Sequence, residues 1–107
     1  MNSMKIALAQ FFVKETSEKN LAVVKDFIDR AYAAGAKLLV LPEGIIARKP
    51  GFGSWSRDHA ETLDGSFVTG LVKATEGKDI AVVGTVHIRV PGETRVHNDL
   101  IVARNGK

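Results

Sequence analysis

The pattern of hydrophobic positions is most regular between residues 16 and 35. Apolar side chains recur there at steps of three and four, and the charged residues fall mostly on the opposite face, as in an amphipathic helix; the apolar positions are Leu21, Val24, Ile28, Ala31 and Tyr32. Thr16 or Ser17 can cap the first turn through its hydroxyl group. Gly35 is well placed for the left-handed residue that ends a helix.

Two short apolar runs flank this helix, at residues 6–9 and 37–41. The second run contains Leu38, Leu39, Val40 and Leu41 without polar alternation, which predicts a strand covered on both faces. A strand, a helix and a second strand within about forty residues predict a βαβ unit with parallel strands. The fold class is therefore α/β.

The second half of the chain predicts a shorter helix within residues 66–77 and two antiparallel strands at 80–90 and 96–104, joined by a turn over 91–94. Residues 45–65 are rich in Gly, Ser and charge, and a loop of this length is usually functional or mobile. Asn105 and Gly106 form a strong hairpin signal, yet only Lys107 follows. We therefore expect a chain cut in mid-architecture, with residues 96–104 as an unpaired edge.

Length and composition limit the functional classes. A chain of 107 residues has room for one domain, and 45% hydrophobic with 25% charged residues is ordinary for a folded protein. The net charge of +3 comes from scattered basic residues, so the sequence gives no indication of nucleic-acid binding. There is no cysteine, which excludes disulfides, thiolate metal ligands and a cysteine nucleophile within these residues. The apolar run near the N-terminus is too short for a signal peptide or a membrane span, so we expect a cytoplasmic location and no membrane partner.

Glu43 is the first candidate for chemistry. It follows the apolar run 37–41 and Pro42, which cannot donate a backbone hydrogen bond and so discourages further strand pairing. Ligand sites in parallel sheets gather beyond the carboxyl ends of the strands. Glu43 is either the first solvated residue of a loop or a general base, and its position alone leaves both readings open.

Other candidates are weaker. The glycines at 51 and 53 lack the remaining residues of a nucleotide-binding loop, and the histidines lack the spacing of a local metal motif; these are His59, His87 and His97. None of the serines at 54, 56 and 66 lies in the G-x-S-x-G turn that exposes a hydrolase nucleophile. We expect no cofactor and no metal.

The long loop carries further residues of interest. Phe52 and Trp55 either line a pocket or fold back onto the core. Arg48 or Arg57 could bind a carboxylate group of a ligand.

Together, the segments "AGAKLLVLPEG", "IAVVGTVHIRV" and "VHNDLIVARNGK" resemble the N-terminal part of a nitrilase-superfamily carbon-nitrogen hydrolase, over nearly all 107 residues. The strand that ends in Pro42 and Glu43 is the most specific element, supported by Asn98 and by the turn at Asn105 and Gly106. The segment "LPEGIIAR" is most similar to bacterial amidases of the deaminated-glutathione type.

The resemblance implies a fold and a mechanism. Residues 1–107 would be the N-terminal portion of a single carbon-nitrogen hydrolase domain, supplying the first strands and two outer helices of a four-layer α-β-β-α sandwich. Glu43 would be the general base of a Glu-Lys-Cys mechanism acting on a small carboxylate-bearing amide, in an enzyme that forms homo-oligomers. Positions for the lysine and the cysteine are absent here, and Lys107 belongs to the turn. This implies an inactive fragment with an uncovered sheet face.

A second hypothesis remains open. The chain would be a non-catalytic interaction module that keeps the βαβ scaffold and associates through its exposed sheet or edge strand. Glu43 would then have no chemical importance.

Overall fold

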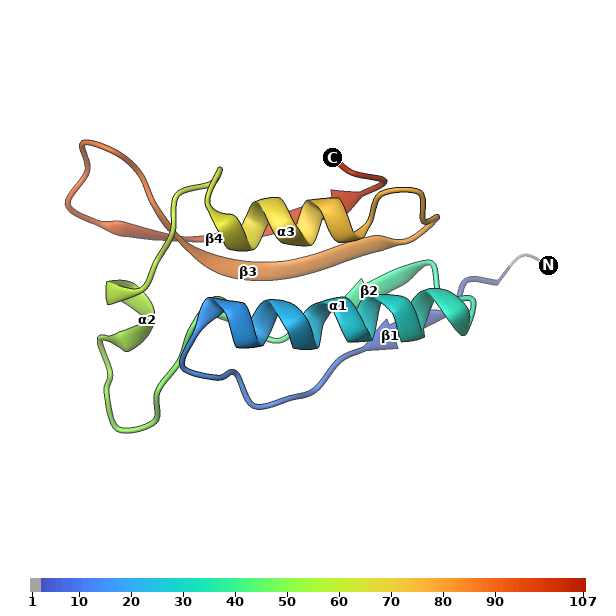
Figure 1. Ribbon diagram of the computed structural model, residues 1–107, viewed down its shortest axis with the longest axis horizontal. Coiled ribbons are helices and arrows are strands. Elements are labelled where there is room, and N and C mark those ends of the chain that lie inside the picture. The colour runs from blue at the N-terminus through green and yellow to red at the C-terminus, as the bar shows by residue number, and fades with distance from the viewer. Residues whose placement is uncertain (1–2) are drawn as a thin grey trace.

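The computed structural model describes residues 3–107 as one four-stranded sheet with its main helices on one side (Figure 1). The strands are β1 (Ile6–Leu8), β2 (Leu38–Val40), β3 (Ala81–Arg89) and β4 (Val96–Arg104), and they lie in the order β1-β2-β3-β4. The helices are α1 (Ser17–Ala33), α2 (Trp55–Asp58) and α3 (Ser66–Ala74). The first three strands are parallel and β4 is antiparallel to β3. The sequence predicted the parallel β1–β2 pair and the antiparallel β3–β4 pair, and the structure adds the parallel pairing of β2 with β3.

Both ends of α1 use the predicted capping groups. The hydroxyl of Thr16 accepts a hydrogen bond from the backbone N–H of Lys19 at 3.3 Å. At the other end Gly35 has φ +82°, and the N–H groups of Gly35 and Ala36 donate back into the last turn, which is the Schellman arrangement. A residue with a side chain is strained at this φ, so the glycine allows the chain to turn directly into β2.

The register of the sheet separates its side chains into two faces. Ala7, Leu39, Val82 and Ala103 occupy one cross-strand row, and this row faces the helices. The two neighbouring rows point the other way. One contains Ile6, Leu38, Ala81 and Arg104, and the other contains Leu8, Val40, Val83 and Val102. We call the first side the covered face and the second the open face.

The expectation that residues 38–41 are covered on both sides is wrong for this chain. Leu39 is 1% exposed, whereas Leu38 and Val40 are only partly buried. Beside them on the open face, Leu8 is 72% exposed and Val102 is 61% exposed. Both main helices lie over the covered face, so nothing in residues 3–107 packs over the open one. The uncovered sheet face expected from the resemblance is confirmed.

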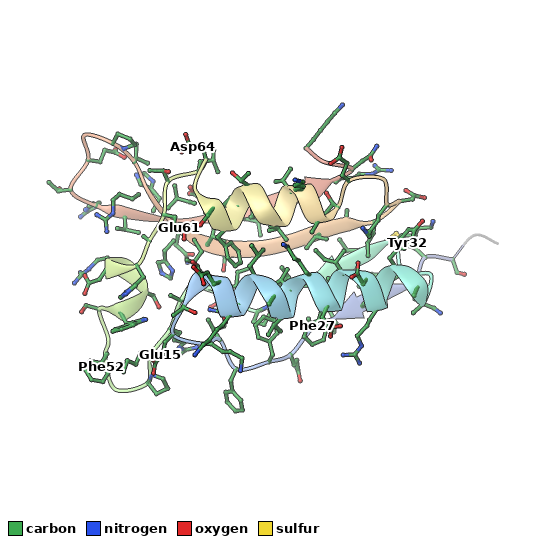
Figure 2. The ribbon with its side chains drawn as sticks, in the orientation of Figure 1. Glu15, Phe27, Tyr32, Phe52, Glu61 and Asp64 are labelled. Carbon is green, nitrogen blue, oxygen red and sulfur yellow. The ribbon has the colours of Figure 1, made fainter. Side chains whose placement is uncertain are left out.

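The segment 45–65 is mostly irregular, but its first residues are buried and it contains one short helix. Ile45, Ile46 and Ala47 are fully buried in the core, and α2 adds one helical turn. The carboxylate of Glu61 accepts a hydrogen bond from the N–H of Phe67 at 2.8 Å, which caps the start of α3 where Gly65 offers no side chain (Figure 2). The predicted long irregular connection is therefore confirmed apart from α2, whereas the burial of its first residues was not predicted.

The turn after β4 has the predicted geometry. Asn105 has φ +49° and Gly106 has φ +78°, and Arg104 and Lys107 exchange two backbone hydrogen bonds across them. The turn is also tied to the end of α3, because the N–H of Gly106 donates to the hydroxyl of buried Thr75 at 3.0 Å. Strand β4 lies at the edge of the sheet within residues 3–107, as expected.

Candidate functional site

Glu43 lies immediately beyond the carboxyl end of β2, where the chain crosses toward β3. Gly44 adopts φ +59°, and its N–H donates to the hydroxyl of Thr85 at 3.2 Å. A Cβ at Gly44 would come within 3.3 Å of the His87 ring. A tight glycine turn held against β3 thus fixes the backbone next to Glu43.

The Glu43 carboxylate is exposed in this chain and borders two hollows on the surface. The apolar rim expected at the end of a covered strand is incomplete, since the open face of the sheet begins beside it. The first hollow has a volume of about 530 Å³ and is lined by Glu43, Gly44, residues 48–53, Ser56, His87 and Asn98. The second has a volume of about 910 Å³ and is lined by residues 11–15, Lys19, Pro42, Glu43, Arg48 and Pro50.

His87 and Asn98 join Glu43 in the first hollow because of the β3–β4 register. The two residues are direct cross-strand partners on the open face. The sequence interpretation treated His87 as an ordinary strand histidine, and the structure brings it to the candidate site. The sequence already contained the information for this pairing. A turn centred between Gly92 and Glu93 places position 87 opposite position 98.

Both aromatic residues of the long segment contribute to this end of the molecule. Phe52 is 56% exposed and lines the first hollow, whereas Trp55 is partly buried against the core. The indole N–H of Trp55 donates to the carbonyl of Glu15 at 2.9 Å, and its ring stacks on His59. Figure 2 shows Glu15 and Phe52 on the same side of the molecule, far from the two chain ends. Phe52 therefore lines a pocket and Trp55 folds back onto the core, so each of the two expected placements holds for one residue.

The two candidate arginines differ in position. Arg48 lines both hollows together with Glu43, whereas Arg57 lines neither. Arg57 lies on α2, and its backbone carbonyl accepts a hydrogen bond from the Arg89 guanidinium at 2.9 Å. The structure thus retains Arg48 as a candidate ligand contact and removes Arg57.

The serine and metal alternatives gain no support from the geometry. Ser54 donates to Asp58, Ser56 to the carbonyl of Ala47 and Ser66 to Glu61, so none of the three is hydrogen-bonded to a histidine. Within residues 3–107, no three His, Asp or Glu side chains are grouped so that they could hold a metal ion. None of the helices in the same range has the length and apolarity needed to cross a membrane.

An acidic residue with a lowered pKa, Asp79, lies at the opposite end of the sheet from Glu43. Asp79 accepts a hydrogen bond from the ammonium group of Lys37 at 2.8 Å and lies 3.6 Å from the Arg104 guanidinium. The hydrogen bond and the charge of Lys37, followed by the charge of Arg104, lower the pKa of Asp79 below its ordinary value. This cluster is a paired surface network and not a candidate site.

Comparison with known proteins finds relatives along nearly the whole chain. Two relatives cover 96% of this chain: a Mycobacterium tuberculosis protein described as a hydrolase is 34% identical over 103 residues, and a deaminated glutathione amidase of Escherichia coli O157:H7 is 29% identical over 104 residues. The chain spans only 35% and 39% of the lengths of these two relatives.

Solved structures show the same fold. A CN-hydrolase superfamily protein from Xanthomonas campestris, whose structure has an arsenic adduct in the active site, matches all of this chain with a TM-score of 0.74 and 25% identity. Nit3 of Saccharomyces cerevisiae, a member of the nitrilase superfamily, matches 97% of the chain with a TM-score of 0.77 and 25% identity. The chain covers 39% and 41% of these two structures.

The family model described as carbon-nitrogen hydrolase matches residues 5–107, which include every strand and helix and every residue lining the two hollows. The chain therefore belongs to the carbon-nitrogen hydrolase family, within the nitrilase superfamily.

Proposed function

We propose that residues 1–107 are the N-terminal portion of a single carbon-nitrogen hydrolase domain that hydrolyses the C–N bond of a small carboxylate-bearing amide. The observation that carries this proposal is the position of Glu43, at the end of β2 and between two hollows, in a chain of this family. The amidase among the relatives supports the amide as the substrate class.

In this proposal Glu43 acts as the general base. It accepts the proton of a cysteine thiol, and the resulting thiolate attacks the amide carbon. The tetrahedral intermediate, held in part by a lysine, expels ammonia or an amine and leaves a thioester. Water then cleaves the thioester and releases the carboxylic acid and the thiol.

This chain contains no cysteine, so the covalent step requires residues outside it. Lys107 belongs to the turn and pairs with Arg104, and we do not assign it the role of the catalytic lysine. We accordingly expect the 107 residues to be inactive by themselves.

The test compares the chain alone with the chain joined to the sequence encoded after Lys107, using short ω-amides and measuring ammonia release. We expect turnover only from the longer protein, and a loss of about 10²- to 10⁴-fold in kcat/KM on Glu43→Gln. Glu18→Gln is the matched control, because Glu18 lies in the first turn of α1 and lines neither hollow. Turnover by the 107 residues alone, or full activity of Glu43→Gln, would contradict the proposal.

A second candidate is favoured by the open face. Four large apolar side chains there are more than half exposed, at Ile6, Leu8, Leu100 and Val102, and apolar surface of this kind is typical of an interaction site. A non-catalytic module would associate through this face or through the edge strand β4. Reading the coding sequence beyond Lys107 separates the two, because an in-frame lysine and a later cysteine favour the enzyme and an immediate stop codon favours the module.

A further inference from the structure

Arg48 and Lys49 are two positive charges at the candidate site whose side chains have no acidic partner. Both line the first hollow together with Glu43, and Arg48 lines the second as well. Within residues 3–107 neither side chain forms an ion pair, and Glu43 is the only acidic residue that lines the first hollow with them. The charge at the hollow is therefore available to an anionic ligand.

The backbone that carries Arg48 is held by hydrogen bonds to the start of α1. Its N–H donates to the carbonyl of Lys14 at 2.8 Å. Asn20, which is fully buried, donates to the carbonyls of Ile46 and Lys14 at 2.9 Å and accepts from the N–H of Lys14. The guanidinium group thus extends from a fixed base, which lowers the entropy lost when it binds a ligand.

Lys49 is positioned by aromatic rings. Its ammonium nitrogen lies 4.5 Å from the centre of the Phe52 ring and 4.9 Å from that of Trp55. Trp55 is itself fixed by its hydrogen bond to Glu15 and by stacking on His59. These cation–π contacts leave the ammonium N–H groups free to donate to an anion within the same hollow.

We propose that Arg48, assisted by Lys49, binds the carboxylate of the substrate and so sets the specificity of the site for anionic amides. A planar guanidinium group matches a carboxylate with two parallel hydrogen bonds, which suits Arg48 for this contact. The negative charge of Glu43 in the same hollow repels the substrate carboxylate, which leaves the uncharged amide end to approach the general base. This inference rests on the proposed function, since it assigns the carboxylate end of the proposed substrate to the same hollow as its amide end.

The experiment uses the full natural polypeptide that carries these residues, with two substrates of equal carbon number: glutaramate, which bears a carboxylate, and the neutral pentanamide. Arg48→Met removes the charge and keeps a flexible apolar chain, Arg48→Lys keeps the charge, and Arg57→Met is the control on α2. We expect Arg48→Met to raise KM for glutaramate about tenfold to a hundredfold with a smaller change in kcat, and to lower kcat/KM for pentanamide by a much smaller factor. Arg48→Lys should retain part of the affinity, and Arg57→Met should behave as the wild type.

Binding of glutarate, measured by calorimetry, tests the same contact without catalysis. We expect Arg48→Met to weaken it by the same factor, and Lys49→Met to weaken it less. The inference is overturned if Arg48→Met leaves the KM for glutaramate unchanged, if it reduces activity on both amides equally, or if the wild type does not bind glutarate. If the wild type hydrolyses neither amide but binds glutarate through Arg48, the proposed reaction fails and the anion site stands.

Discussion

The two faces of the sheet are built from the same four strands and differ in what lies over them. On the covered face, Leu39 and Val82 pack beneath α1 and α3 and are at most 1% exposed. On the open face, Leu8 and Val102 are equally apolar and more than half exposed. Residue type alone therefore does not separate the two faces, because helices within this chain cover only one of them.

The largest effect should come from truncating a covered side chain. We expect Leu39→Ala to lower the free energy of unfolding by about 3 kcal/mol, because the buried methyl groups are lost and a cavity remains. Leu8→Ala, on the adjacent strand and the open face, should change it by less than about 0.5 kcal/mol. Urea unfolding of the two variants gives both values.

Equal losses in the two variants would contradict the exposure of the open face, because Leu8 would then be buried in solution. In that case the Leu8→Ala effect should shrink on dilution, as expected for burial between associating copies.

A smaller loss of folding free energy is expected when the buried amide side chain of Asn20, beside the site, is removed. Asn20→Ala leaves the N–H of Lys14 and the carbonyls of Lys14 and Ile46 without their partner, and we expect it to cost about 2 kcal/mol. Lys25→Ala, on an exposed position of the same helix, is the control and should be nearly neutral. Unfolding midpoints measure the loss, and a neutral Asn20→Ala would show that segment 45–48 is held by apolar packing alone.

The smallest effect concerns Asp79, which pairs with Lys37 and with Arg104 at the end of the open-face row of Ile6. Lys37, through its hydrogen bond and its charge, and then Arg104 lower the pKa of Asp79 below its ordinary 3.8, so ionised Asp79 stabilises the folded chain above that pH. The stabilisation is lost as the pH falls through the lowered pKa. We expect Asp79→Asn to be slightly less stable than the wild type at pH 7, with the difference closing in acid and in high salt.

Unfolding midpoints measured at several pH values check this prediction. Glu76→Gln is the control, because Glu76 is exposed and makes no ion pair within residues 3–107. A gap between Asp79→Asn and the wild type that widens in acid would contradict the assigned direction.

Local patterns accounted for most of the secondary structure. The three- and four-residue spacing, the hydroxyl of Thr16 and the freedom of Gly35 define α1, and the structure confirms each of them. The β3–β4 pair was predicted from its turn, and the register follows from the turn's centre. These features depend on interactions between residues that lie close in sequence, so they can be read without knowing the fold.

The candidate site was predicted only in part. Glu43 was singled out by its place after an apolar strand, and Arg48 was one of two arginines that the sequence did not rank. His87, Lys49 and the hydrogen bonds of Asn20 were missed, because their significance depends on contacts between segments far apart in the chain. The burial of segment 45–47 was not predicted for the same reason, since it requires α1 and β3 to be in place.

The sequence by itself indicated the family, through the segments that resemble it, and the position of one carboxylate at a strand end. Short-range periodicity predicted the four strands and the two longer helices, but not α2. The tertiary structure decided which face of the sheet is covered and which basic residue lies beside Glu43. Those outcomes depend on how separate segments pack, and an apolar strand residue has the same local pattern whichever face the helices cover.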